Sequence, residues 1–206
     1  MNRRDRNSMH EDDAYWLDKA YNNKLNYFYI KGDTMYVAGT DNKQDVWDDI
    51  TKVPAWGKLT DSARYNMVKP VLDKNPEIKK LVGHSLGGIT ALRLQEQMPE
   101  RKFEVTTYGA PVMGFFGGNN TRYRHPLDPI SMFDMSPFTK SVPVLSINPL
   151  TTHSYKGYTY DYDKGNLAPK FPINQPPPPN ELVQQNYNSI PKNFNSVSTN
   201  NSYQTS

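Results

Sequence analysis

A serine lies between glycines at residues 83–87, GHSLG, which fits the pattern Gly-x-Ser-x-Gly. A β-like run at residues 78–82 precedes this segment, and a helix-like run at residues 86–98 follows it. Between a strand and a helix, the glycines permit a sharp turn that lifts the serine Oγ clear of the sheet. The pattern therefore predicts that Ser85 is a nucleophile. The alternative is a packing turn, in which the glycines only let the helix approach the sheet.

A serine hydroxyl is a weak nucleophile unless a neighbouring base takes its proton. After an elbow of this kind the partners follow in the order acid, then histidine. The chain has 4 histidines. His10 lies in a polar N-terminal stretch, and His84, as the sequence neighbour of the serine, is expected to point away from its face. His125 precedes every suitable acid except those too close to the elbow. We therefore predict that His153 is the base.

Asp128, within RHPLDPISMF, is the predicted acid because it lies on a loop beyond the strand that follows the elbow helix. Asp134 is the alternative acid. Other acids lie on or just after the elbow helix or on the next strand, which disfavours them: Glu96, Glu100 and Glu104. Taken singly, an aspartate before proline is a common turn residue, and a lone histidine is commonly a surface residue. The order of serine, aspartate and histidine is what favours a catalytic set.

Acyl transfer also needs hydrogen-bond donors for the negative charge that develops on the carbonyl oxygen. The backbone N–H of Leu86, directly after the serine, is one predicted donor. The second should come from the end of an earlier strand, and residues 36–40, YVAGT, end such a strand. We predict that Thr40 supplies this donor through its N–H or its hydroxyl. The alternative is a strand that merely ends in Gly-Thr.

The elements around these residues predict an α/β sandwich with an N-terminal β-hairpin and later strands that are parallel. The hairpin spans residues 25–40, with Lys31-Gly32-Asp33 at its turn. Helices are expected at 14–23, 61–74 and 86–98, with Thr60 as an N-cap and a kink or break at Pro70. Strands are expected at 78–82, 103–109 and 142–147, and the chain beyond Gly109 has the composition of a loop.

Residues 164–206 are rich in Asn, Gln, Ser and Pro, with Pro176–Pro179 in a row. Such a segment buries too little apolar surface to offset its conformational entropy, so we expect a disordered tail. The 206-residue chain then divides into a flexible, polar arm at 1–13, one domain at 14–163 and this tail. The hydrophobic content of 36% is low for a globular protein, which agrees with a chain that is only partly packed in a core.

Composition and charge disfavour several classes of protein. The net charge of +3 is too small to predict nucleic acid as the main partner. The chain has no cysteine, so neither a disulfide framework nor a thiolate metal site is expected. The early arginines are not followed by the apolar core of a signal peptide, and no apolar run is long enough for a transmembrane segment. A cytoplasmic location is therefore the default expectation.

The elbow segment LVGHSLGG resembles the nucleophile elbow of the class 3 lipase family, a group of α/β-hydrolases. Three further segments resemble that family in the same order along the chain: VAGTDNKQDVWDDI, VTTYGAPVMG and RYRHPLDPISMF. The likeness covers residues 25–155. The chain departs from the family pattern in three places. Ala38 stands where the family usually has arginine, and the segment LTDSARYNM lacks the His-x-Gly-Phe-like element. The residues around His153 resemble the family least.

The resemblance implies a compact α/β-hydrolase-like fold and a serine hydrolase that cleaves carboxylic esters, most of all the acyl esters of triacylglycerol or phospholipid. It assigns Ser85, Asp128 and His153 to a catalytic triad, and Thr40 and Leu86 to the oxyanion site. No metal or organic cofactor is implied.

Residues 41–59 follow the oxyanion strand, where related lipases carry a lid. Trp47, Ile50 and Trp56 are therefore candidates for a lid that binds substrate or makes transient contact with a lipid surface. The alternative is that these side chains close the core of a small domain. A different class of function also fits the chain: a non-catalytic, lipase-like scaffold or binding protein, attached through its tail to a larger assembly such as a virion.

Overall fold

A computed structural model describes residues 11–40, 63–112, 116–131, 134, 139–141 and 153–154. The chain divides into two units, and all of these residues lie in the first, Met1–Pro176. Several predictions fall outside the described residues: the lid candidates Trp47, Ile50 and Trp56, the N-cap Thr60, the strand at 142–147, and the boundary between domain and tail.

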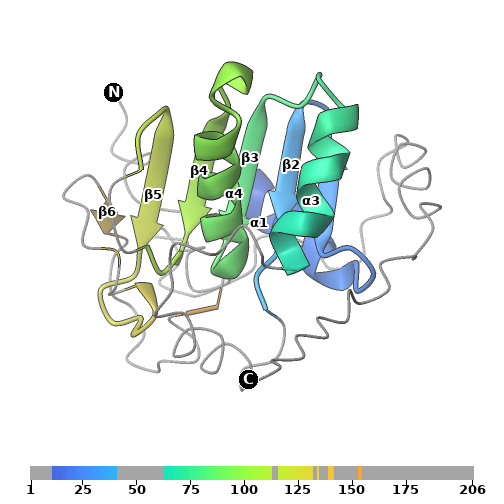
Figure 1. Cartoon of the computed structure of the whole chain (residues 1–206). Helices are drawn as coiled ribbons and strands as arrows, with labels where there is room; N and C mark the ends of the chain where they lie inside the picture. Colours follow the sequence, from blue (N-terminus) through green and yellow to red (C-terminus); the bar gives the residue numbers. More distant parts are fainter. Residues whose placement is uncertain are drawn as a thin grey trace, which may run out of the picture. The chain divides into compact units, whose positions relative to one another are not determined.

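The described part is an α/β fold built on one mostly parallel sheet of six strands (Figure 1). The strands lie in the sheet in their order along the chain. Only the first two are antiparallel, and every later neighbouring pair is parallel. The strands are β1 (Phe28–Lys31), β2 (Thr34–Val37), β3 (Lys80–His84), β4 (Glu104–Tyr108), β5 (Asn120–Arg124) and β6 (Lys140–Ser141).

The N-terminal hairpin forms as predicted. Lys31 pairs with Thr34 across a two-residue turn. Gly32, the first residue of that turn, has φ +58°, a conformation that side chains other than glycine adopt rarely. Glycine at this position is typical of hairpin turns that match the twist of the strands.

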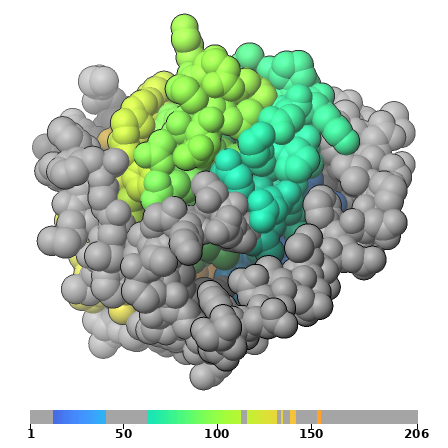
Figure 2. Space-filling model, viewed as in Figure 1, coloured from blue at the N-terminus to red at the C-terminus, as the bar shows by residue number. Residues whose placement is uncertain are grey.

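Helices cover both faces of the sheet. The helix α1 (Glu11–Asn22) lies behind the strands in Figure 1, whereas α3 (Ala63–Lys74) and α4 (Leu86–Gln97) lie in front. The space-filling view shows α3 and α4 packed side by side over that front face (Figure 2). A short 3₁₀ helix, η3 (Pro99–Arg101), then leads into β4.

Aromatic side chains fill the space between α1 and the sheet. Trp16 of α1 stacks on Tyr29 of β1, with ring centroids 5.2 Å apart. Tyr108 and Tyr123, from β4 and β5, stack on each other at 5.1 Å. All four belong to one buried cluster on this face. Stacked or tilted aromatic pairs add to the free energy gained from burying their area, so this cluster ties α1 to the strands.

The helix α1 begins at Glu11, earlier than the predicted start at residue 14, so part of the expected flexible arm is helical. The carboxylate of Asp13 accepts a hydrogen bond from the Tyr108 hydroxyl at 2.8 Å. This long-range contact holds the first turn of α1 against β4. The sequence could not reveal it, because the two residues are far apart along the chain.

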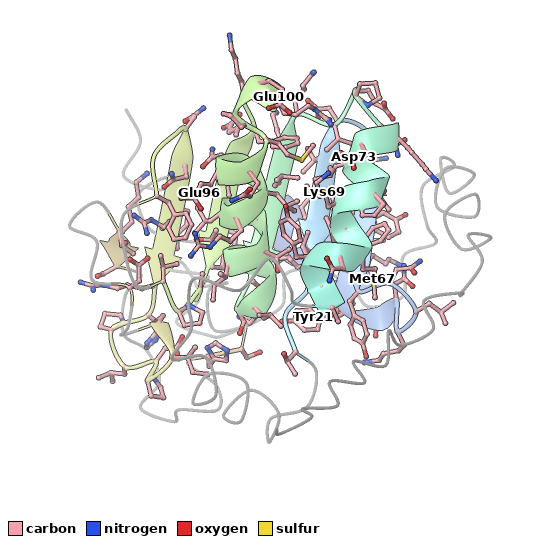
Figure 3. The ribbon with its side chains drawn as sticks, in the orientation of Figure 1. Tyr21, Met67, Lys69, Asp73, Glu96 and Glu100 are labelled. Atoms are coloured by element: carbon pink, nitrogen blue, oxygen red, sulfur yellow. The ribbon has the colours of Figure 1, made fainter. Side chains whose placement is uncertain are left out.

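The helix does not break at Pro70, one of the two predicted outcomes: α3 runs without interruption from Ala63 to Lys74. Pro70 lies on the exposed side of the helix, while Val71 and Leu72 are buried. Proline costs the helix one backbone hydrogen bond, and burial of the apolar side chains around it offsets that loss. Figure 3 shows Lys69 and Asp73 on the outer surface of the same helix.

The strand β5 was also missed, because its sequence NTRYR follows glycines and is mostly polar. Its central residue Arg122 is buried and pairs with Asp134 at 3.4 Å. Because a charged residue occupies the buried central position, the hydrophobicity pattern does not predict this strand. The strand matters for function, because the loop that carries Asp128 begins at its end.

Arg101 joins the end of α3 to the start of β3. Its guanidinium donates to the carbonyl oxygens of Leu72, Asn75 and Ile78 at 2.7, 2.9 and 3.0 Å. We expect Arg101→Met to lower the free energy of unfolding by about 2–3 kcal/mol, because these carbonyls lose a charged donor. Urea denaturation measures the change.

Lys69→Met is the matched control, because it also removes one cation, from an exposed i,i+4 pair with Asp73. Exposed pairs of this kind contribute only about 0.3–0.5 kcal/mol. Equal losses for the two variants would show that Arg101 is no more than a surface charge.

Among the helices that the structure describes, none combines the length and the apolar character needed to cross a lipid bilayer.

Candidate active site

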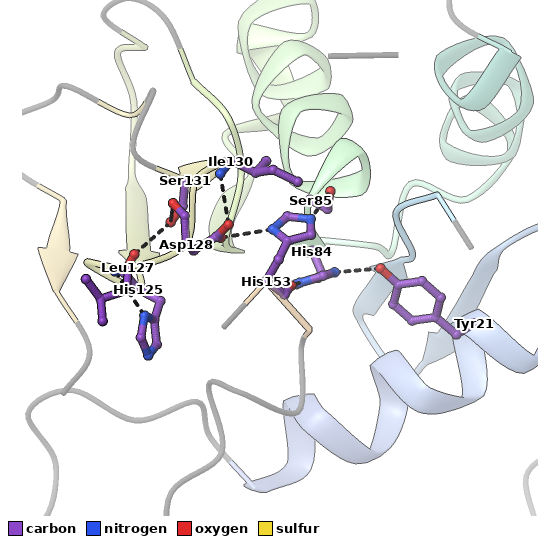
Figure 4. A network of polar contacts seen from close by, with 9 residues as sticks. All are labelled: Tyr21, His84, Ser85, His125, Leu127, Asp128, Ile130, Ser131 and His153. Atoms are coloured by element: carbon purple, nitrogen blue, oxygen red, sulfur yellow. Dashed lines mark hydrogen bonds and ion pairs between the residues drawn. The ribbon is translucent and has the colours of Figure 1, made fainter. Parts of the chain in front are cut away.

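The candidate site lies where the parallel strands end. Ser85 sits between β3 and α4, and Asp128 follows β5. The parallel pairing of β3, β4 and β5 brings the carboxyl ends of these strands to one edge of the sheet. His153 reaches the same edge from much later in the chain (Figure 4). Polar residues from three separate segments therefore meet at one place.

Ser85 has an unusual backbone conformation, with φ 54° and ψ −125°. A positive φ is rare for a residue other than glycine, and it persists only where the surrounding structure holds it. The turn places the serine at the N-cap of α4 without using its side chain as a helix cap. The hydroxyl is therefore left for another partner.

The glycines of the elbow are required by close packing. A methyl group on Gly83 would lie 2.4 Å from the carbonyl oxygen of Gly87, and one on Gly87 would lie 2.2 Å from that of Val37. Helix, strand and turn approach too closely for any side chain there. The packing explanation for the glycines thus holds, but it does not account for the contacts of Ser85.

The three residues of the predicted triad form a continuous chain of hydrogen bonds (Figure 4). His153 Nε2 lies 2.9 Å from Ser85 Oγ, and His153 Nδ1 lies 2.9 Å from Asp128 Oδ2. Ser85 and Asp128 are 3% and 0% exposed. Distances of this size are within reach for proton transfer between heavy atoms.

The surroundings of Asp128 keep its carboxylate ionised. Burial alone would raise its pKa, but the hydrogen bond and the charge of His153 lower it, together with hydrogen bonds from the Ile130 N–H and the Ser131 hydroxyl. The Ile130 N–H donates to Oδ1 at 2.9 Å. The net effect is a pKa below the ordinary value for aspartate. An ionised carboxylate here holds the proton of the imidazole on Nδ1.

The alternative acid, Asp134, does not contact His153 in the described structure. Its carboxylate pairs with Arg122, and its backbone carbonyl accepts from Arg124 at 2.9 Å. These contacts anchor the loop that carries Asp128. The disfavoured acids Glu96 and Glu100 lie on the outer face of α4 and beyond its C-terminus, away from the end of the sheet where Tyr21 lies (Figure 3).

The segments that carry the two predicted oxyanion donors both adjoin the serine. Leu86 is the first residue of α4, so its N–H has no acceptor within the helix and lies at the positive end of the helix dipole. Thr40 follows Gly39, which lies directly against the serine, since a methyl group on Gly39 would be 2.8 Å from Ser85 Cβ. The segment after β2 and the N-terminus of α4 therefore both lie beside Ser85.

The sequence did not reveal the role of His84. It is buried on the α1 face of β3, where its Nδ1 lies 2.5 Å from the Tyr21 hydroxyl. Its Nε2 lies 2.8 Å from the backbone carbonyl oxygen of His153. Burial, followed by the proximity of His153, lowers the pKa of His84 to about 3. His84 thus points away from Ser85, as predicted, yet it contacts the segment that carries the base.

The low pKa of His84 makes stability depend on pH. The unfolded chain binds a proton near pH 6.5, but the folded chain does so only near pH 3. Stability from this group is therefore complete above about pH 6.5 and falls as pH drops toward 3, by up to about 1.4 kcal/mol per pH unit. We expect the stability advantage of the wild type over His84→Gln to shrink between pH 7 and pH 4.5 in urea denaturation. A constant difference would mean that the pKa of His84 is the same in the folded and unfolded chains.

Within the described residues, no three side chains of histidine, aspartate or glutamate cluster in a way that could hold a metal ion. The site that the described residues form is a serine, a histidine and an aspartate in hydrogen-bond contact.

Comparison with protein-family models finds no match for this chain, and no curated protein matches its sequence.

Proposed function

We propose that this protein is a serine hydrolase of the class 3 lipase type, with an α/β-hydrolase-like fold, and that it cleaves carboxylic esters through an acyl-enzyme. The observation that carries the proposal is the unbroken hydrogen-bond chain from Ser85 through His153 to Asp128. The strained turn at Ser85 and the elbow resemblance LVGHSLGG support the same conclusion.

In the first half of the reaction, His153 Nε2 takes the proton of Ser85 as Oγ attacks the carbonyl carbon of the ester. The carbonyl oxygen becomes an oxyanion, which accepts hydrogen bonds from the Leu86 N–H and from Thr40. The imidazolium then gives its proton to the leaving alcohol oxygen, and the C–O bond breaks. Asp128 holds the Nδ1–H and stabilises the positive charge on the ring.

In the second half, His153 removes a proton from water, which attacks the acyl-enzyme. A second tetrahedral intermediate collapses, the proton passes to Ser85 Oγ, and the carboxylic acid leaves. Each step needs only the groups already described. The lid candidates lie outside the described residues, so preference for lipid acyl esters rests on the family resemblance and on the aromatic content of residues 41–59.

A fluorophosphonate probe tests the proposal directly, because it reacts only with an activated serine. We expect the wild type to be labelled at Ser85 and Ser85→Ala to remain unlabelled. Thr90→Val is the matched control: it removes a hydroxyl from α4 that donates only to the Leu86 carbonyl at 2.9 Å, so labelling should persist. A series of p-nitrophenyl esters of increasing chain length then measures acyl preference.

A folded wild-type protein that takes up no label would contradict the proposal. It would instead support a binding or scaffold protein that keeps this fold without the activity.

A further inference from the structure

Tyr21 and His84 form a buried bridge between two parts of the candidate site. The Gly39 N–H donates to the Tyr21 hydroxyl oxygen at 3.0 Å. That hydroxyl contacts His84 Nδ1, and His84 Nε2 contacts the carbonyl oxygen of His153. The bridge therefore begins beside the proposed oxyanion residue Thr40 and ends on the residue proposed as the base. Figure 4 shows the contact between Tyr21 and His84.

The chemistry of the partners sets the direction of every bond in this bridge. A backbone carbonyl oxygen only accepts, so His84 Nε2 must carry a hydrogen. In a neutral imidazole the other nitrogen is then an acceptor, and the Tyr21 O–H donates to it. The Tyr21 oxygen is left to accept from Gly39. All three bonds run in one direction, from Gly39 to His153, and each group is satisfied.

Geometry and burial favour the neutral form of His84. The side chain is 3% exposed, and its two ring nitrogens lie against the Tyr21 hydroxyl and the His153 carbonyl oxygen. A protonated ring would place a second N–H against the Tyr21 hydroxyl, whose oxygen already accepts from Gly39. The direction of the pKa shift of His84, lowered by burial, agrees with this arrangement.

We propose that Tyr21 and His84 are positioning residues, which set the distance between the oxyanion segment and the imidazole of His153. The proposal rests on the proposed hydrolase function. Neither side chain is a hydrogen-bond partner of Ser85 Oγ, and His84 is the residue directly before Ser85 in the chain. The rings of His84 and His153 are 5.3 Å apart between centroids. Without the bridge, the carbonyl of His153 loses its hydrogen bond to His84, and the distance between the His153 ring and Ser85 Oγ is no longer fixed.

Two variants of His84 separate the bonds of the bridge. His84→Leu removes both contacts and keeps a similar volume. His84→Gln keeps a side-chain N–H that can reach the carbonyl of His153 but loses the acceptor for Tyr21. We expect kcat for a p-nitrophenyl ester to fall about 30–100-fold in His84→Leu and only about 3–10-fold in His84→Gln, with KM changed less than about twofold, since misplacement of about 1 Å can cost a hundredfold.

Tyr21→Phe removes only a hydroxyl, and Tyr108→Phe is its matched control. The Tyr108 hydroxyl also lies in the core between α1 and the sheet, but it donates to Asp13. We expect Tyr21→Phe to lower kcat about 5–20-fold, while Tyr108→Phe keeps kcat within about twofold at a similar loss of stability. Equal kcat values for the two tyrosine variants would overturn the proposal.

Amide hydrogen exchange tests the bridge without any activity. We expect the peptide that contains Gly39 to exchange faster in Tyr21→Phe, and the peptide that contains His153 to exchange faster in His84→Leu than in His84→Gln. Unchanged exchange at both peptides would overturn the bridge even in an active enzyme. An unlabelled wild type with the expected exchange pattern would refute the hydrolase function and leave the bridge intact, so the two failures can be told apart.

Discussion

Replacing His153 with alanine is expected to lower kcat for ester hydrolysis by about 10⁶-fold, a loss as large as that from removing the nucleophile itself. His153 contacts both Ser85 Oγ and the Asp128 carboxylate, each at 2.9 Å. Without it, the proposed mechanism loses both the base that accepts the serine proton and the acid that protonates the leaving alcohol. The rate of p-nitrophenyl butyrate hydrolysis at saturating substrate measures the effect.

The double variant Ser85→Ala with His153→Ala tests whether the two residues act as one catalytic unit. Residues that act as one unit give losses that do not add, so the double variant should hydrolyse the ester no more slowly than either single variant. Thermal unfolding checks that each variant is folded. If His153→Ala keeps a tenth or more of the wild-type kcat, another group is the base, and the proposed mechanism is wrong.

Asp128→Asn is expected to lower kcat by about 10³–10⁴-fold with little change in KM. The carboxylate holds the imidazole proton on Nδ1, which leaves Nε2 free to accept from Ser85. An amide at this position can donate to Nδ1 instead, and it then stabilises the tautomer whose Nε2 carries the hydrogen. That tautomer cannot take the serine proton. The shape of the side chain is unchanged, so the loss reports on charge and tautomer rather than on packing.

Asp134→Asn is the matched control, because it makes the same chemical change at another buried aspartate near the same loop. Its carboxylate pairs with Arg122, not with His153. We expect it to lower stability while it leaves kcat within a few-fold of wild type. A larger loss of kcat from Asp134→Asn than from Asp128→Asn would reverse the assignment of the acid.

Much of the fold follows from local patterns. The strand before the serine, the helix after it and the hairpin at Gly32 form where the sequence predicts them, with small differences at their ends. The hydrophobic period of these segments is strong, and glycine marks their turns. The errors share a cause. At Pro70 and in β5, contacts between distant residues override what composition alone suggests.

In the candidate site, too, some residues follow from local sequence patterns and others only from contacts between distant segments. The order along the chain was enough to select Ser85, His153 and two candidate acids, Asp128 and Asp134, because the elbow predicts a downstream acid and base. Tyr21 and His84 carried no such signal. A tyrosine in a helix and a histidine in a strand are ordinary core residues by pattern, and their bridge joins residues that are distant in the sequence.

What this sequence determines by itself is the local chemistry: a serine on a glycine-lined turn, between a strand and a helix, with an acid and a histidine downstream. Steric rules for glycine and the periods of strands and helices act over a few residues, so they can be read from the chain alone. Only the tertiary structure decided which of two aspartates meets the imidazole and which buried groups brace it. Those choices depend on the pairing of parallel strands and on hydrogen bonds between segments that no local pattern records.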